Sequence, residues 1–422
     1  MIRLYNCLVL PMTDGCRTFS GEVWTDGDKI SYVGAARPDA PAFEREIDLR
    51  GGLVMPGFKN MHTHSAMVFL RSFADDLPLH RWLTERVFPL EARLTPEAVY
   101  AFTRLAILEY LAGGTTFSFD MYFHREAYAQ ANIDMGFRSV ICGALSAGDS
   151  LAVAADDYAR FNSLHPLIGY RLGVHAEYTA DEALLRGISE LTHEYEAPFW
   201  SHNSETRAEV DGSYERRGMS PTAYFDSLGL YDYGGGGFHC VWLDENDMDI
   251  FSRRGLAAVT CPASNAKLAS GIAPLGSFAK RGIALAVGTD GAASNNALDM
   301  FREMYLACVL QKLQSEDPAA CPAEDILLAA CSAGARAAGL ADCDSLAAGK
   351  QADLTVIDLD RPSMRPIHNA VRNTVYAGSR DCVALTMVAG RVLYERGEFH
   401  VGEDVGRIIA EAEKYTREVC GE

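Results

Sequence analysis

A regular alternation of short apolar runs with longer helix-like stretches fills the middle of this chain. Eight runs rich in strand-forming residues occur there, and each is followed by a helix-like stretch. Parallel strands joined by helices form either a closed barrel or an open sheet. Eight such repeats predict a (β/α)8 TIM-like barrel. The predicted strands cover residues 53–64, 115–119, 139–143, 171–175, 199–202, 238–241, 257–260 and 284–287.

A doubly wound open sheet is the alternative, because it uses the same alternation. No GxGxxG phosphate loop follows an early strand, and this favours the barrel. A helix is predicted over residues 95–111, with Thr95 as N-cap, Pro96 at its first position and the glycine pair 113–114 after its end. The four glycines at 234–237 are predicted to form a loop.

The two ends of the chain are built differently, from short strands joined by turns. Strand-like segments on either side of Asp26-Gly27-Asp28 indicate a hairpin, and similar strand-like runs return after residue 350. We therefore expect one small β-sandwich domain made from residues 1–56 and 345–400. The barrel would occupy residues 57–344, and a C-terminal helix residues 401–422.

Composition excludes some partners. The net charge of -19 repels nucleic-acid backbones and anionic lipid surfaces. No apolar stretch approaches the ~20 residues that a membrane helix needs. The 11 cysteines are scattered without a regular framework, which is typical of a reducing compartment. We expect a cytoplasmic protein that binds neither nucleic acid nor membrane.

Histidines gather at the ends of the predicted strands. His62 and His64 follow the first strand, and residues i and i+2 of a strand point to one face. His175, His202 and His239 end three later strands. A barrel places its catalytic groups at the C-terminal ends of its strands, so these side chains are expected to converge.

Together with Asp290, which follows the last strand, this set suits a catalytic metal ion. His62, His64, His202 and Asp290 supply three neutral nitrogens and a carboxylate, and such sites lower the pKa of bound water towards ~7. One divalent ion is expected; zinc fits best, and iron or manganese also fit. Glu205, three residues after His202, is a candidate proton shuttle. His239 would stabilise the developing alkoxide, and Asp290 would also accept the water's proton.

Several motifs make the chain resemble the amidohydrolase superfamily, and more closely its 5-methylthioadenosine/S-adenosylhomocysteine deaminase branch. The superfamily motifs are residues 55–58 with His62-Thr63-His64, residues 239–242 and Gly288-Thr289-Asp290-Gly291. The branch motifs are Ala74-Asp75-Asp76-Leu77-Pro78-Leu79 with Trp82, Glu91-Ala92-Arg93, Asp120-Met121-Tyr122-Phe123, Lys267-Leu268-Ala269-Ser270-Gly271 and residues 291–296.

The resemblance implies a mononuclear site and several substrate contacts. Glu91 matches the carboxylate used on ribose hydroxyls, and His175 matches a residue expected to hydrogen-bond the purine ring. Trp82 would shape the pocket mouth. Arg138 is a candidate for the homocysteine carboxylate of S-adenosylhomocysteine, but no second arginine follows in residues 145–152, so smaller 5'-modified adenosines or adenosine are favoured. Glu177 departs from the branch pattern and would bring negative charge to the pocket rim.

The leading hypothesis is therefore hydrolytic deamination of an adenosine-type nucleoside: adenosine, 5'-deoxyadenosine, 5'-methylthioadenosine or S-adenosylhomocysteine. A deaminase of a free base, pterin or triazine ring keeps the same site and is the alternative. A non-catalytic scaffold is a remote one, because every proposed ligand is present. The resemblance also suggests a homodimer or homotetramer. Whether residues 72–89 close over the substrate is left open.

Overall fold

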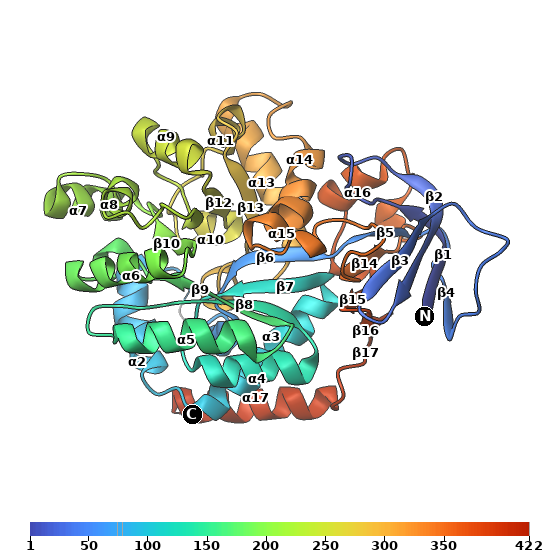
Figure 1. Ribbon diagram of the computed structural model, residues 1–422, viewed down its shortest axis with the longest axis horizontal. Coiled ribbons are helices and arrows are strands. Elements are labelled where there is room, and N and C mark those ends of the chain that lie inside the picture. Colours follow the sequence, from blue (N-terminus) through green and yellow to red (C-terminus); the bar gives the residue numbers. More distant parts are fainter. Residues whose placement is uncertain (74, 78, 422) are drawn as a thin grey trace.

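Eight parallel strands form a sheet whose spatial order follows the sequence from β6 to β13. The computed structural model describes residues 1–73, 75–77 and 79–421. The last strand returns to the first: the Asp290 amide donates to the His62 carbonyl at 2.9 Å, and the Asn60 side chain donates to Thr289. The predicted barrel is confirmed, and the doubly wound sheet is wrong (Figure 1). Its strands are β6 (Phe58–Thr63), β7 (Thr115–Asp120), β8 (Arg138–Cys142), β9 (Ile168–Gly173), β10 (Phe199–Asn203), β11 (Gly235–His239), β12 (Ala257–Thr260) and β13 (Ala284–Val287).

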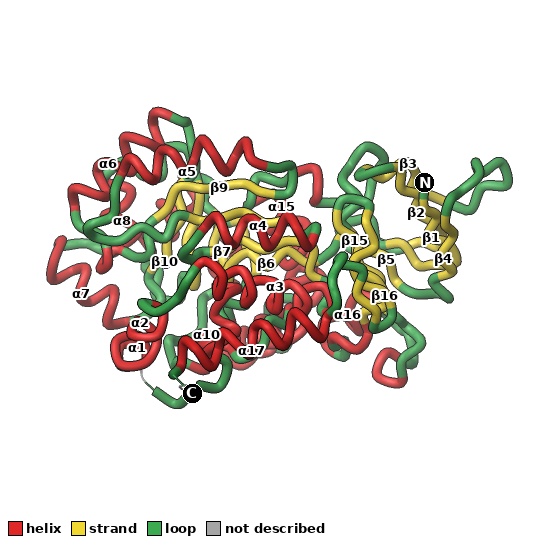
Figure 2. Tube along the Cα trace, turned by 90° about the horizontal axis from the view of Figure 1, so that it is seen from below, coloured by secondary structure: helices red, strands yellow, loops and turns green. Residues whose placement is uncertain are grey.

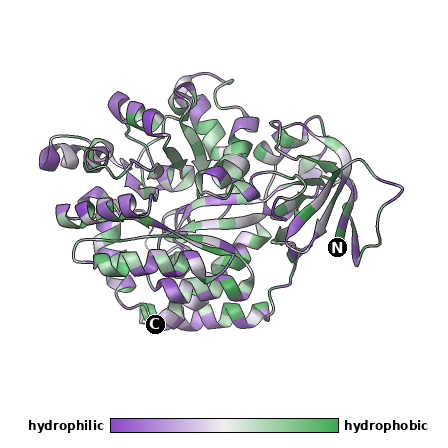
Figure 3. Cartoon of the chain, viewed as in Figure 1, coloured by the Kyte–Doolittle hydropathy of each residue, from purple (hydrophilic) through white to green (hydrophobic). Residues whose placement is uncertain are grey.

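Helices surround the barrel on its outer side, and its strands are buried on both faces (Figures 1 and 3). The predicted helix between the first two strands is α3; Thr95 accepts from the Ala98 amide and so caps it. The barrel helices are α1 (Leu79–Trp82), α2 (Phe88–Glu91), α3 (Pro96–Ala112), α4 (Arg125–Met135), α5 (Leu151–Leu164), α6 (Glu182–Glu194), α7 (Arg207–Arg217), α8 (Pro221–Ser227), α9 (Glu245–Arg254), α10 (Pro262–Lys267), α11 (Leu275–Lys280), α12 (Ala292–Asn295), α13 (Met300–Ser315), α14 (Ala323–Leu328) and α15 (Gly334–Ala337).

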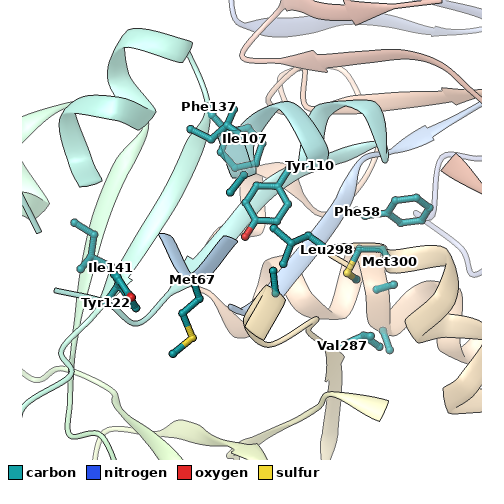
Figure 4. Packing of buried hydrophobic residues seen from close by; sticks show 14 of the residues in the cluster. Phe58, Met67, Ile107, Tyr110, Tyr122, Phe137, Ile141, Val287, Leu298 and Met300 are labelled. Atoms are coloured by element: carbon teal, nitrogen blue, oxygen red, sulfur yellow. The ribbon is translucent and has the colours of Figure 1, made fainter. Parts of the chain in front are cut away.

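Aromatic and aliphatic side chains fill the layer between the strands and these helices (Figure 4). Tyr110 of α3 stacks on Phe137 with ring centroids 5.6 Å apart. Phe58 of β6 meets Phe301 of α13 edge to face at 5.1 Å. The contact of Phe58 holds the first strand, which carries His62 and is followed by His64, against α13.

The glycine run predicted to be a loop is instead most of strand β11. A Cβ on Gly236 would lie 2.3 Å from the Ala257 carbonyl oxygen and 2.5 Å from the Trp200 ring. Trp200 is buried inside the barrel and needs this space. The loop prediction is wrong because close packing, rather than a turn, requires these glycines.

Both chain ends contribute to a second, mixed sheet at one end of the barrel (Figures 1 and 2). Its strands form one hydrogen-bonded path except for β4, which pairs with β1 beside that path. A bridge between Lys29 and Gln351 brings distant parts of the path together, so the sheet curls on itself where the sequence predicts a sandwich. The predicted strand at 53–64 divides at Gly57, and its first part belongs to this sheet. The strands are β1 (Ile2–Val9), β2 (Phe19–Asp26), β3 (Lys29–Gly34), β4 (Arg45–Asp48), β5 (Leu53–Pro56), β14 (Leu354–Ile357), β15 (Val383–Val388), β16 (Arg391–Glu395) and β17 (Glu398–Phe399).

Two further helices follow β14. One is α16 (Ala370–Tyr376), inside the region for which only strands were expected, and the other is α17 (Val405–Cys420). Helix α17 lies along α3 at the barrel's outer surface, and Arg104 of α3 pairs with Glu411 on it (Figures 1 and 2). In the part of the chain that the structure describes, no helix is long and apolar enough to cross a membrane.

Arg138 does not reach the substrate pocket, so its predicted contact is wrong. It is the first residue of β8 and therefore lies at the N-terminal end of the barrel, opposite the strand ends that carry the histidines. Its Nε donates to Asp353 at 2.6 Å, and its Nη2 donates to Gln351 at 2.9 Å. Arg138 thus holds the second sheet against the barrel floor.

Replacing Arg138 with alanine is expected to lower the free energy of unfolding by about 3–5 kcal/mol, because Asp353 would stay buried without its partner. The KM for substrate should not change. Arg186→Ala, which removes an exposed ion pair with Glu182, is the matched control and should cost less than about 1 kcal/mol. Urea unfolding and steady-state kinetics measure both effects; a raised KM with normal stability in Arg138→Ala would contradict this assignment.

Candidate metal centre and active site

The candidate ligands lie together at the C-terminal edge of the barrel. His62 is in β6, His64 directly follows that strand, and His202 is in β10. His239 is the last residue of β11, and Asp290 lies just beyond β13. Strands distant in the sequence therefore bring five potential ligands to one place.

The ligand atoms form two overlapping groups. The donor atoms of His62, His202 and His239 lie within 4.8 Å of one another, and so do those of His62, His64 and Asp290. His62 belongs to both groups. Its two ring nitrogens are buried without a hydrogen-bond partner, and such unpaired buried polar atoms are costly. A metal ion bound by one of these nitrogens would remove that cost at the bound nitrogen.

Three of the histidine rings are oriented by hydrogen bonds that their Nδ1 atoms make. His64 Nδ1 lies 2.6 Å from the Met121 carbonyl oxygen, and His202 Nδ1 lies 2.6 Å from that of His175. His239 Nδ1 lies 2.8 Å from the Asn265 side-chain oxygen. Because the two carbonyl oxygens require a proton on Nδ1 of His64 and His202, the Nε2 atom of each of these rings keeps its lone pair for a metal, the arrangement found around protein-bound metals.

Charge in the site also favours a cation. His64 Nε2 lies 3.2 Å from Asp290 Oδ1. Burial lowers the pKa of His64, but the neighbouring carboxylate outweighs it and raises the pKa to about 9, so this place stabilises a positive charge. A metal ion bound here would take the place of the proton on Nε2. Burial lowers the pKa of His62 and His202, which keeps them neutral and able to bind a metal. The residues present therefore fit a divalent ion.

Asp290 is held firmly for its place in this site. Its Oδ2 accepts hydrogen bonds from Ser264 at 2.6 Å and Ser294 at 2.7 Å, and its Oδ1 accepts one from the Gly291 amide. Asp290 and His239 both have positive φ, at 59° and 69°. Non-glycine residues held in this region store strain of about 1–3 kcal/mol, which is common at functional sites.

Glu205 lies beside the cluster, as its position three residues after His202 predicts. One of its oxygens is 3.8 Å from His239 Nε2, and the other accepts from Ser270 at 3.1 Å. Burial raises the pKa of Glu205, so this carboxyl can carry a proton closer to neutral pH. Glu209 holds the Glu205 backbone in place, because its carboxylate accepts a hydrogen bond from the Glu205 amide at 2.7 Å. Burial raises the pKa of Glu209 to about 7.

A cleft that is partly open to solvent leads to the cluster. Glu91 and Trp82 line it, and the Tyr122 hydroxyl donates to Glu91 at 2.8 Å. His175 also lines it, and burial lowers its pKa to about 4. The other lining residues are His64, Met67, Leu83, Phe88, Met121, Tyr122, Phe123, Ala144, Ser146, Tyr178, Thr179, His202, Glu205, His239, Leu268 and Asp290.

Glu177 does not bring negative charge to the pocket rim, and that expectation is wrong. It is buried and paired with Arg216 at 2.5 Å and with Arg217 at 3.1 Å. Asp75 pairs with Lys267 at 2.5 Å. Ala74 and Pro78, within the run compared with the deaminase branch, lie outside the described residues.

The residues that support the cluster are the part that sequence reasoning missed. Asn265, Ser264 and Glu209 carry no metal-ligand or nucleophile pattern of their own. Ser270 and Tyr122 stand inside runs noted for the family resemblance, and that position was the available signal. The roles of all five depend on strand order, which only the fold gives.

Comparison with known proteins agrees with this geometry. The chain belongs to the amidohydrolase family, whose model matches residues 53–393. It is similar to a 5-methylthioadenosine/S-adenosylhomocysteine deaminase of Pelotomaculum thermopropionicum, with 38% identity over 93% of both chains. A 5'-deoxyadenosine deaminase of Methanothermobacter thermautotrophicus shares 38% over 91% of both. The crystal structure of an adenosine deaminase from Xanthomonas campestris with bound zinc superimposes with a TM-score of 0.94 at 32% identity, covering 100% of this chain and 99% of that one.

We expect one divalent ion per chain. His62→Ala and His202→Ala should lose the ion, because each removes a donor from the cluster, whereas His175→Ala should keep it. Elemental analysis by mass spectrometry after gel filtration measures the ratio of metal to protein. Two ions per chain, or full occupancy in His62→Ala, would contradict a mononuclear site.

Proposed function

We propose that this amidohydrolase removes the exocyclic amine of an adenosine-type nucleoside, with one zinc ion held by His62, His64, His202 and Asp290. The observation that carries the proposal is the meeting of this ligand set with Glu205 in one cleft that also holds a half-buried carboxylate, Glu91. The relatives named as adenosine, 5'-deoxyadenosine and 5-methylthioadenosine deaminases support the same reading.

When bound, the ion supplies Lewis acidity, which makes water nucleophilic at neutral pH. The chain's own residues manage the protons. Asp290 accepts a proton from the attacking water, and Glu205 delivers one to the departing amine. His239 stabilises the oxygen on which negative charge develops. A C6–O bond forms and the C6–N bond breaks, giving the inosine analogue and ammonia.

Glu91 and His175 would orient the nucleoside. A carboxylate accepts well from two vicinal hydroxyls, and the bond from Tyr122 fixes Glu91 for the ribose. The lowered pKa of His175 keeps its ring neutral, so that it can hydrogen-bond a purine nitrogen.

The cleft favours a small or apolar 5' substituent. Among the described lining residues there is no lysine or arginine. Lys267 is paired with Asp75 and Arg217 with Glu177, and Arg138 lies at the opposite end of the barrel. Phe88 lies one turn before Glu91 on α2, and Phe123 adjoins Tyr122, so apolar rings flank the proposed ribose site. A zwitterionic homocysteine tail would find no cation there.

Ammonia release from zinc-loaded protein tests the function. We expect turnover of adenosine, 5'-deoxyadenosine and 5'-methylthioadenosine, with S-adenosylhomocysteine having a lower kcat/KM. Glu205→Gln should lower kcat by about 10²–10⁴-fold with zinc retained, because the proton shuttle is lost. Absence of turnover on all four adenosine compounds would overturn the proposed function. Efficient turnover of S-adenosylhomocysteine would overturn only the proposal that the cleft favours a small or apolar 5' substituent.

Glu91→Ala separates nucleosides from free bases. Loss of a charged acceptor for the ribose should raise the KM for adenosine about 10–100-fold. Any slow turnover of adenine or guanine should not change, since neither has a ribose. Glu97→Ala, at an exposed carboxylate on α3, is the control and should match the parent. Equal activity of the parent on free bases, unaffected by Glu91→Ala, would favour a nucleobase deaminase instead.

Assembly as a homodimer or homotetramer and a cytoplasmic location stay predictions from the sequence.

A further inference from the structure

A buried carboxylate outside the cleft connects two short helices that support the catalytic groups. Glu303 lies in the first turn of α13 and is fully buried. Its Oε2 accepts from the Ala263 amide of α10 at 2.9 Å, and its Oε1 accepts from the Asn295 side chain of α12 at 2.7 Å. It does not line the cleft.

Each of these helices carries a partner of the active site. From α10, Ser264 donates to Asp290 at 2.6 Å, and Asn265 accepts from His239 at 2.8 Å. From α12, Ser294 donates to Asp290 at 2.7 Å. Asn295 also donates to the carbonyl oxygen of Thr289, the residue before Asp290, at 2.6 Å.

The two helices are too short to hold these positions alone. Helix α10 has 6 residues and α12 has 4, and isolated helices of this length are unstable. A single side chain that bonds to both fixes their spacing. Burial raises the pKa of Glu303 to about 8, and the bonds from Ala263 and Asn295 act against this rise because they favour the ionised form. Both atoms that face Glu303 are N–H donors, so the position requires two acceptors, which a carboxylate provides and an amide does not.

We propose that Glu303 is a positioning residue for the reaction: it braces α10 and α12 so that Asp290 and His239 keep their orientation at the metal centre. In Glu303→Gln the side-chain NH₂ would face one of the two donors, which would separate one helix from the brace. The shift of that helix would move Ser264 and Asn265, or Ser294, and so change the hydrogen bonds that orient Asp290 and His239. This inference rests on the proposed function for its kinetic readout only.

The test uses the full-length protein loaded with zinc for kinetics and with cobalt(II) for spectroscopy. Glu303→Gln should lower kcat for adenosine at least about tenfold with little change in KM, as removal of supporting residues around metals does. The visible absorption bands of the cobalt form should shift, because the geometry around the ion changes. Asp247→Asn is the matched control: Asp247 is a fully buried carboxylate on α9, bonded to Ser220. It should lower thermal stability but leave kcat and the cobalt spectrum unchanged.

Asn295→Ala removes one of the two hydrogen bonds to Glu303 and tests the positioning role if Glu303→Gln does not fold. We expect a smaller loss in kcat and a smaller shift of the cobalt bands than in Glu303→Gln. An unchanged cobalt spectrum, with kcat within about twofold of the Asp247→Asn control, would overturn the proposal. If the parent protein deaminates no adenosine, the proposed function fails, and the cobalt spectrum alone still tests the brace.

Discussion

The hydrogen bonds to the Nδ1 atoms of His64, His202 and His239 are the constraint on which the site depends. The bonds made by His64 and His202 fix one tautomer, so that their Nε2 atoms remain free to bind a metal, and the bond to Asn265 fixes the direction of the His239 ring. The acceptors are backbone carbonyls after or between strands in two cases and the Asn265 side chain in the third. The barrel therefore acts as a rigid frame that sets ligand direction as well as ligand position, and the unpaired His62 ring completes the donor set.

The two ends of the barrel have different tasks. At the N-terminal end, Arg138 and Asp353 join the barrel to the second sheet, and burial of that pair makes it structural. At the C-terminal end, strain at Asp290 and His239 and raised pKa values at Glu205 and Glu209 gather in one small region. Groups that cost folding energy are concentrated where chemistry would use them. A charged residue such as Arg138 can be assigned to substrate binding or to structure only when the end of the barrel at which it lies is known.

The sequence alone predicts the barrel, its eight strands and the gathering of histidines at their ends, because buried parallel strands read as apolar runs with polar groups at their ends. It does not predict that Gly235–Gly237 form a strand, since this depends on Trp200 from the neighbouring strand. The prediction for Arg138 is wrong for a related reason. Residue 138 begins its strand, and an error of a few residues in the strand bounds changes the end of the barrel at which a side chain is expected. The supporting residues Asn265, Glu209 and Glu303 act through contacts between separate elements, which local patterns do not contain.

The central claim is that a water molecule, activated at this histidine cluster, replaces the amine at C6 of an adenosine. Reaction of 5'-methylthioadenosine with the zinc-loaded protein in H₂¹⁸O, followed by mass spectrometry of the purine product, tests this claim most directly. The account predicts one ¹⁸O atom in the purine ring system of an intact nucleoside, with one ammonia released per product. Release of free adenine, or recovery of unlabelled substrate alone, would contradict it.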